Sequence, residues 1–343
     1  MIKINQSPVL TSKHYGINEF MFDETLLYSK TNNFNDYYIE NITLNKLQKL
    51  PKNNLSLDID NHTKQNYNFA KKVVIDKTGK DIKYITFKPN QNLIDALEIT
   101  IKKDIETKLI IKYLSDQKLF CSSTIKVNIE QNAKLDIVLI SNLQNANANL
   151  NSLEINCDTN SQTNLHFLDF SANISTQNIS ANLFGNNVKF NLDSIYFGKD
   201  YDRLSLNYLI NISGKECATN MNALGILDNY SQKSFIGTIN FLEGSNKSVG
   251  EENEHCILLS KFTKSKSVPI LLSHEEDVDG KHSSSCGKFD EDKIFYLTSR
   301  GLTLMEAKKL LVKAKLNKLI NKIKDESLIN EIYVQLDKYF ESN

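Results

Sequence analysis

Short segments with alternating hydrophobicity dominate residues 108–275, and they constrain the fold more than any other feature of the chain. Ile125, Val127 and Ile129 alternate with polar residues. The same alternation returns in segments 135–139, 190–197, 204–212, 220–227 and 235–242. A period of two is typical of strands with one buried face, and helical periodicity is nearly absent across this stretch. The sequence therefore predicts a chain that is mainly β.

The connections between these segments are short and carry Gly, Asn or Asp. They begin at Gly198, Gly214, Asp228 and Gly244. Many short strands in series are typical of a sandwich, a barrel or a β-solenoid. Asn at the loop edges favours a solenoid, because its turns use left-handed backbone conformations. The lack of a strict repeat counts against a regular solenoid. Periodicity alone thus leaves solenoid and sandwich equally open.

The N-terminal part looks mixed. Residues 35–50 have a helix-like pattern, whereas residues 84–87 look like a strand. We therefore divide the chain into a mixed α/β segment (1–107), a β core (108–295) and a C-terminal helical segment (296–343).

The C-terminal segment begins with a helix start signal. Thr303 and Glu306 have the spacing of a capping box, and Gly301 is expected to end a preceding strand. The expected apolar face of this helix comprises Leu304, Ala307, Leu311 and Ala314. A second helix is expected to bury Ile329, Ile332, Leu336 and Tyr339 or Phe340.

Composition and charge limit the partners and the cellular compartment that the chain fits. Lys and Arg number 41, and so do Asp and Glu, so the formal net charge is zero and gives no pull toward nucleic acid or an anionic membrane. No run of about 18 apolar residues appears, and the first residues lack the apolar core of a signal peptide. The five cysteines are scattered, odd in number and form no CxxC. These features together predict a protein of the reducing cytoplasm, without a membrane span.

Potential metal ligands gather near the end of the β core. His255, Cys256, His274, His282 and Cys286 fall within one stretch, beside several acidic residues. Thiolate, imidazole and carboxylate are the groups that iron and zinc use. The spacing matches no zinc finger, so this clustering predicts either a metal or cluster site, or residues that meet by chance on surface turns.

Signatures of common enzymes are missing from the sequence. It has no GxSxG elbow, no GxxxxGK[ST] phosphate loop and no strand-linked GxGxxG. The sequence therefore gives no support for an α/β-hydrolase, a P-loop nucleotidase or a dinucleotide-binding enzyme. Two rivals stay open: a β-helix polysaccharide lyase or hydrolase, which needs carboxylates converging from several turns, and a structural β-solenoid, which would be secreted.

The stretch from Phe235 to about residue 320 resembles the shared core of the SufB/SufD family. It contains Phe-Ile-Gly-Thr-Ile-Asn-Phe-Leu-Glu-Gly-Ser from Phe235 and Asp-Glu-Asp-Lys-Ile-Phe-Tyr-Leu-Thr-Ser-Arg-Gly from Asp290. Between them lie Pro269 and His282. SufD is favoured over SufB, because the SufB pattern places Glu directly after this histidine and the present chain has Ser283. An undifferentiated SufB/SufD type is the alternative.

The resemblance implies a right-handed parallel β-helix with α-helical segments at both ends. It implies a scaffold subunit of a SUF-type iron–sulfur cluster assembly complex, paired with a SufB-like subunit and docking a SufC-like ABC ATPase. A homodimer is possible when the chain is isolated. Any iron–sulfur cluster would be transient and lie at a subunit interface, with none expected in the isolated chain.

The resemblance also assigns residues. His282 matches a histidine implicated in the nascent cluster, and Cys256 and Cys286 are second-rank candidates as metal ligands. The expected ATPase-binding surface consists of Phe295, Tyr296, Arg300, Leu304, Ala307 and Leu311.

Overall fold

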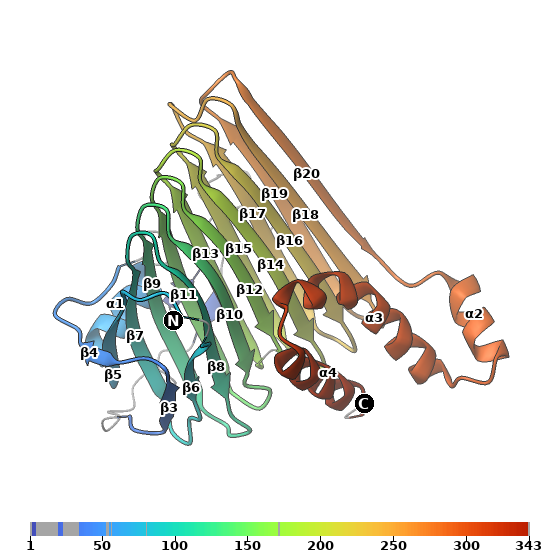
Figure 1. Ribbon diagram of the computed structural model, residues 1–343. Coiled ribbons are helices and arrows are strands. Elements are labelled where there is room, and N and C mark those ends of the chain that lie inside the picture. Colours follow the sequence, from blue (N-terminus) through green and yellow to red (C-terminus); the bar gives the residue numbers. More distant parts are fainter. Residues whose placement is uncertain are drawn as a thin grey trace.

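The core is a parallel β-helix built from two facing sheets (Figure 1). The computed structural model describes residues 2–4, 20–22, 34–52, 55, 57–79, 81–170 and 172–341. From residue 69 onward, successive strands alternate between the sheets, so each strand pairs in parallel with the strand two places along the chain. The predicted parallel β-helix is thus confirmed, and the sandwich alternative is wrong.

The two nine-stranded sheets are named here by their strand numbers. The even sheet, apart from β3, has the order β20 (Val278–Gly287), β18 (Ser248–Leu258), β16 (Ala218–Leu227), β14 (Lys189–Gly198), β12 (Gln162–Asp169), β10 (Lys134–Asn142), β8 (Glu106–Leu114), β6 (Lys83–Phe87) and β3 (Tyr37–Glu40). The odd sheet, apart from β4, has the order β19 (Lys264–Ser273), β17 (Gln232–Phe241), β15 (Arg203–Ile212), β13 (Ile174–Leu183), β11 (Ala148–Cys157), β9 (Phe120–Ile129), β7 (Leu93–Ile101), β5 (Phe69–Ile75) and β4 (Leu44–Lys46). A separate antiparallel pair joins β1 (Ile2–Ile4) to β2 (Phe20–Phe22).

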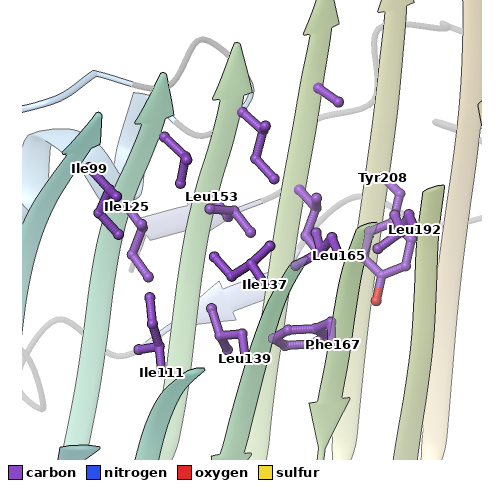
Figure 2. Packing of buried hydrophobic residues seen from close by; sticks show 14 of the residues in the cluster. Ile99, Ile111, Ile125, Ile137, Leu139, Leu153, Leu165, Phe167, Leu192 and Tyr208 are labelled. Carbon is purple, nitrogen blue, oxygen red and sulfur yellow. The ribbon is translucent and has the colours of Figure 1, made fainter. Parts of the chain in front are cut away.

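Alternation along each strand fills the space between the sheets. Ile99, Ile125 and Leu153 point inward from the odd sheet, and Ile137 and Leu165 from the even sheet (Figure 2). All five side chains are buried. Burial of apolar surface stabilises each such residue by about 1.5–3 kcal/mol, so the period of two seen in the sequence is the source of this core.

Asparagine shapes the turns. Asn132, Asn160 and Asn187 each have a positive φ, at 60°, 56° and 56°. Their amides also form a ladder from turn to turn, in which Asn160 Nδ2 donates to Asn132 Oδ1 over 3.0 Å and Asn187 Nδ2 donates to Asn160 Oδ1 over 3.3 Å. Left-handed conformation is tolerated best by Asn and Gly, which explains the Asn at these positions.

Helices cover the outer faces of both sheets. α1 (Leu57–Asn66) buries Ile59 against the odd sheet, whereas α3 (Leu304–Ile320) and α4 (Glu326–Glu341) lie on the even sheet (Figure 1). A 3₁₀ turn, η3 (Asn321–Ile323), joins these last two helices. The predicted helical segments at both ends are therefore confirmed.

The capping box that starts α3 is confirmed. The Thr303 backbone N–H donates to Glu306 Oε2 over 2.8 Å, and the Glu306 N–H donates to Thr303 Oγ1 over 3.2 Å. The apolar face expected for this helix is wrong in part, since Leu304 and Ala314 are exposed and Val312 is buried instead. The reason is the hydrophobic outer face of the even sheet, which sets the rotation of the helix. For α4 the predicted burial of Ile332, Leu336, Tyr339 and Phe340 is confirmed.

Two local predictions are wrong. The helix expected at 35–50 is replaced by β3 and β4, which pair antiparallel with β6 and β5, because edge pairing outweighs the helix-like pattern. The strand expected before Gly301 is the helix α2 (Glu291–Ser299), whose start is fixed by Asp290 accepting from the Asp292 N–H over 3.0 Å. Parallel pairing begins already at β5, within the segment expected to be mixed.

Candidate functional site

The C-terminal end of the β-helix is open. β19 and β20 come last in their sheets, and within the described residues each pairs with a neighbouring strand on one side only. Figure 1 shows β20 at this edge, with α2 standing clear of the sheets beyond it. The backbone N–H and C=O groups on the free side of such a strand are available to another chain.

His282 lies on this edge. β20 is in register with β18, so His282 is aligned with Glu252, whose side chain points into the β-helix and is buried. His282 continues the same inward-facing row, but no further turn covers it, and it is exposed. The predicted histidine is therefore placed where a second chain could reach it.

Cys256 and Cys286 face each other across β18 and β20. They are direct register partners, Cys256 being fully buried and Cys286 exposed. Their thiols are in hydrogen-bonding contact, with Cys256 donating. This hydrogen bond lowers the pKa of Cys286 to about 6 and, together with burial, raises the pKa of Cys256. The structure therefore brings together two residues that lie thirty apart in the sequence.

A buried ion pair lies deeper in the same end of the β-helix. Lys233 Nζ and Glu254 Oε1 are 2.7 Å apart, and both side chains are fully buried. Glu254 also accepts from Tyr196 Oη at 2.7 Å, Ser284 Oγ at 2.9 Å and Ser267 Oγ at 3.0 Å. Burial alone would raise the pKa of Glu254, but Lys233 and these hydroxyls lower it below its usual value. Glu254 is therefore held as a carboxylate in one fixed position.

Glu252 differs from its neighbour. Its side chain is buried, and neither carboxyl oxygen has a hydrogen-bond partner among the described residues. Space for this carboxyl depends on Gly237, since a Cβ there would lie 2.0 Å from Glu252 Oε1. Burial, helped by the negative charge of Glu254, raises the pKa of Glu252 to about 8. A buried acid without a hydrogen-bond partner is costly to the fold.

Lys233, Tyr196 and Glu252 were missed by the sequence analysis. The available signal was the alternation of Glu252, Glu254 and Cys256, which places all three on one face of a strand. Within the described part of the chain, however, no three His, Cys, Asp or Glu side chains are arranged to hold a metal ion. The chain by itself offers ligand groups on an open edge rather than a closed metal site.

The residues predicted to contact an ATPase lie mostly on the surface. Phe295 and Tyr296 of α2 are 73% and 57% exposed, and the Arg300 guanidinium lies 5.4 Å from the centre of the Tyr296 ring. α2 buries none of its own residues. Leu304 is exposed, Leu311 is half-buried, and Ala307 is buried, so the Ala307 side chain is not part of this surface.

A polar cavity of about 730 Å³ lies between the even sheet and α3. Its carboxylates include Asp193, which accepts from Lys322 Nζ at 2.7 Å and from Asn222 Nδ2 at 3.0 Å. Asp193 is thus engaged in holding the C-terminal segment against the sheet. The other carboxylates that line the cavity are Glu251, which accepts from Asn253 Nδ2 at 2.8 Å, and Glu254, which pairs with Lys233.

No helix in the described ranges is both long enough and apolar enough to cross a membrane.

Comparison with known families and proteins gives a consistent result. Residues 84–315 match the family model described as "SUF system FeS cluster assembly, SufBD core domain". The iron–sulfur cluster assembly protein SufD of Escherichia coli is 19% identical over 258 residues, which cover 75% of this chain and 60% of that protein. SufD of Bacillus subtilis is 23% identical over 159 residues, covering 46% of this chain and 36% of that protein. A SufBD family protein of Mycobacterium leprae is 28% identical over 138 residues, covering 38% and 35%.

The chain thus spans 36% and 60% of the lengths of the two SufD proteins. The family match itself covers more than half of this chain and contains β18, β20 and most of α3. The chain therefore belongs to the SufB/SufD family of iron–sulfur cluster assembly proteins, and it resembles SufD.

Proposed function

We propose that this chain is a non-catalytic, SufD-like scaffold subunit of a SUF-type iron–sulfur cluster assembly complex. In this proposal the β19–β20 edge joins a SufB-like subunit, and iron and sulfide are the cargo assembled at the junction. The main observation that supports this proposal is that His282 is exposed on an open sheet edge, where it is the register partner of the buried Glu252. Its free thiols suit the cytoplasm, where we place it.

The open edge supports pairing with a similar subunit. Exposed edge strands are usually shielded in stable monomers, because their free backbone groups recruit other strands. A SufB-like partner that ends in a comparable edge could extend both sheets across the junction, using main-chain hydrogen bonds for affinity. The same edge would allow the isolated chain to pair with a second copy, which is the homodimer expected without a partner.

The ligand chemistry of the edge supports a shared and labile cluster. His282 offers an imidazole and Cys286 a thiol, both groups that bind iron in proteins. Glu252 lies beside His282 in the register and carries a buried carboxyl that has no partner within the described chain. A ligand set completed only by a second subunit would hold the cluster loosely enough for later release.

The surface of α2 supports docking of the ATPase. Exposed Phe295 and Tyr296 form an aromatic patch on α2, a helix that has no fully buried residue. Large aromatic side chains are enriched at the centres of protein interfaces. Nucleotide hydrolysis would then belong to the partner, in agreement with the absence of a phosphate loop from the sequence.

The cluster role is tested by His282→Ala in the co-expressed complex under anaerobic conditions. Iron and acid-labile sulfide should fall at least severalfold, while all subunits still co-purify. The matched control is His274→Ala, since His274 is also exposed and lies in the turn just before β20. Normal cluster content in the His282 variant, or an equal loss in the control, would contradict the assignment.

The docking role is tested by Phe295→Asp. Capture of the ATPase by the tagged chain should be lost, because a charge would replace an aromatic anchor. Val334→Asp is the control, since Val334 is similarly apolar and 52% exposed but lies on α4. Unchanged capture by the Phe295 variant would remove α2 from the docking surface.

A further inference from the structure

We propose that Cys256 and Cys286 form a reversible disulfide on exposure to peroxide, which ties the terminal strand β20 to β18. The formation of this bond does not depend on the proposed function. Its consequence does, because the bond would withdraw both sulfurs from the proposed cluster site and hold the edge in one conformation.

The register satisfies the geometry of a disulfide. Cys256 and Cys286 are direct partners in the parallel pairing of β18 and β20. Directly paired Cα atoms on neighbouring strands lie about 4.8 Å apart, with side chains on the same face. Disulfides need a Cα separation of roughly 4.4–6.8 Å. Because the two residues are already aligned in register, β20 need not shift along β18 to form the bond.

Exposure divides the two sulfurs into an attacking and a resolving group. Cys286 is exposed at the edge, whereas Cys256 is buried beneath it. The other three cysteines, Cys121, Cys157 and Cys217, are all buried. Peroxide in solution reaches the exposed thiol and not the four buried ones, so Cys286 is the site of first attack.

The chemistry balances with peroxide as the oxidant. The Cys286 thiolate attacks one peroxide oxygen, the O–O bond breaks, and Cys286 becomes a sulfenic acid while hydroxide leaves and takes a proton to form water. Cys256 then attacks the sulfenic sulfur, the S–O bond breaks, and a second water forms from that oxygen, with the Cys256 proton as one of its two hydrogens. Two thiols are oxidised to one disulfide, and one hydrogen peroxide is reduced to two waters.

The bond would act on a strand at the edge of the β-helix. β20 is held by β18 alone among the described strands. The crosslink would close a loop that contains β19 and both flanking turns, and it would limit local opening of the edge. A subunit oxidised in this way would keep its fold but present no free thiol at the edge.

The test uses the whole chain, fully reduced and then treated with a small excess of hydrogen peroxide. Mass spectrometry should show the loss of two hydrogens, peptide mapping should find Cys256 linked to Cys286, and dithiothreitol should reverse both changes. In Cys256→Ser, dimedone should instead trap a sulfenic acid on Cys286. In Cys286→Ser no link should form, whereas Cys121→Ser should behave like the unchanged chain.

Three results would overturn the proposal. The first is oxidation of Cys286 to sulfinic acid in the unchanged chain while Cys256 stays reduced. The second is a link that involves Cys121, Cys157 or Cys217 in its place. The third is hydrogen exchange in β20 that is not slowed at least severalfold in the linked form.

The regulatory consequence is read separately, by assembling the complex from oxidised and from reduced chain. Cluster yield should be lower with the oxidised chain and recover after dithiothreitol. An equal yield from both would overturn the control of assembly but leave the mapped disulfide standing. Failure of the proposed function is seen differently, as a His282→Ala complex that makes clusters normally.

Discussion

Replacing Lys233 by Met should destabilise the last turns of the β-helix. Lys233 and Glu254 form an ion pair of 2.7 Å with no exposed surface on either side chain. Met keeps the volume of the lysine stem but removes the charge, so Glu254 is left as a buried carboxylate without its cation.

The magnitude follows from the geometry. Two unit charges at 2.7 Å attract by about 6 kcal/mol at an effective dielectric constant of about 20. Removing the lysine also removes the cost of burying its ammonium group, and this gain offsets several kcal/mol of the lost attraction. Three hydroxyl groups continue to donate to Glu254. We therefore expect a loss of about 3 kcal/mol, near the low end of the 3–5 kcal/mol seen when one partner of a buried pair is removed.

Denaturant unfolding, with hydrogen exchange of β17 as a local probe, measures this loss. Lys281→Met is the control, because Lys281 and Asp279 form an exposed pair of 3.2 Å with side chains 71% and 59% exposed. Its effect should be at most about 0.5 kcal/mol.

A double variant, Lys233→Met with Glu254→Gln, should regain more than half of the loss, since no buried charge remains. A loss below about 1 kcal/mol in the Lys233 variant would refute the reasoning. A double variant whose loss equals the sum of the two single losses would refute it too.

Two further predictions concern the buried carboxyls of Asp95 and Glu252. Burial raises the pKa of Asp95 to about 7, against hydrogen bonds that lower it, so the folded state holds this proton more tightly than the unfolded state. The free energy of unfolding should therefore decrease by about 3 kcal/mol as the pH rises from 4 to 7, and Asp95→Asn should abolish this part of the pH dependence in denaturant titrations. Gly237→Ala should destabilise the fold by about 1–3 kcal/mol, because the new Cβ would lie 2.0 Å from Glu252 Oε1. The control is Gly287→Ala, which should be neutral because a Cβ there meets nothing within 4 Å. Equal shifts in melting temperature for the two variants would contradict this packing.

Local patterns predicted the elements whose stability is local. The capping box of Thr303 and Glu306 was readable because both partners lie within one helical turn. The strands of the core were readable because a period of two in hydrophobicity is itself the cause of their burial. Helix α2 was missed. None of its residues is fully buried, so its hydrophobic residues show no clear helical period. The helix expected at 35–50 failed because pairing with distant strands outweighed its local preference.

The candidate site likewise contains residues that the sequence named and a contact that it did not reveal. The structure places His282, Phe295 and Tyr296 on the surface, and all three were named from the sequence through the family resemblance. The contact between Cys256 and Cys286 was not, because it depends on how many residues each turn of the β-helix uses.

The sequence by itself determined the mainly β class of the fold, the start of α3, and the residue types available at the edge. Only the tertiary structure decided which of those residues meet. One full turn advances by 28 residues between β10 and β12 but by 30 between β18 and β20, so no fixed repeat reveals the register. That register places Lys233 against Glu254, leaves Glu252 without a partner among the described residues, and sets one buried thiol against one exposed thiol at the open end. Turn length is a property of loops, whose residues vary freely as long as the stacked strands stay paired.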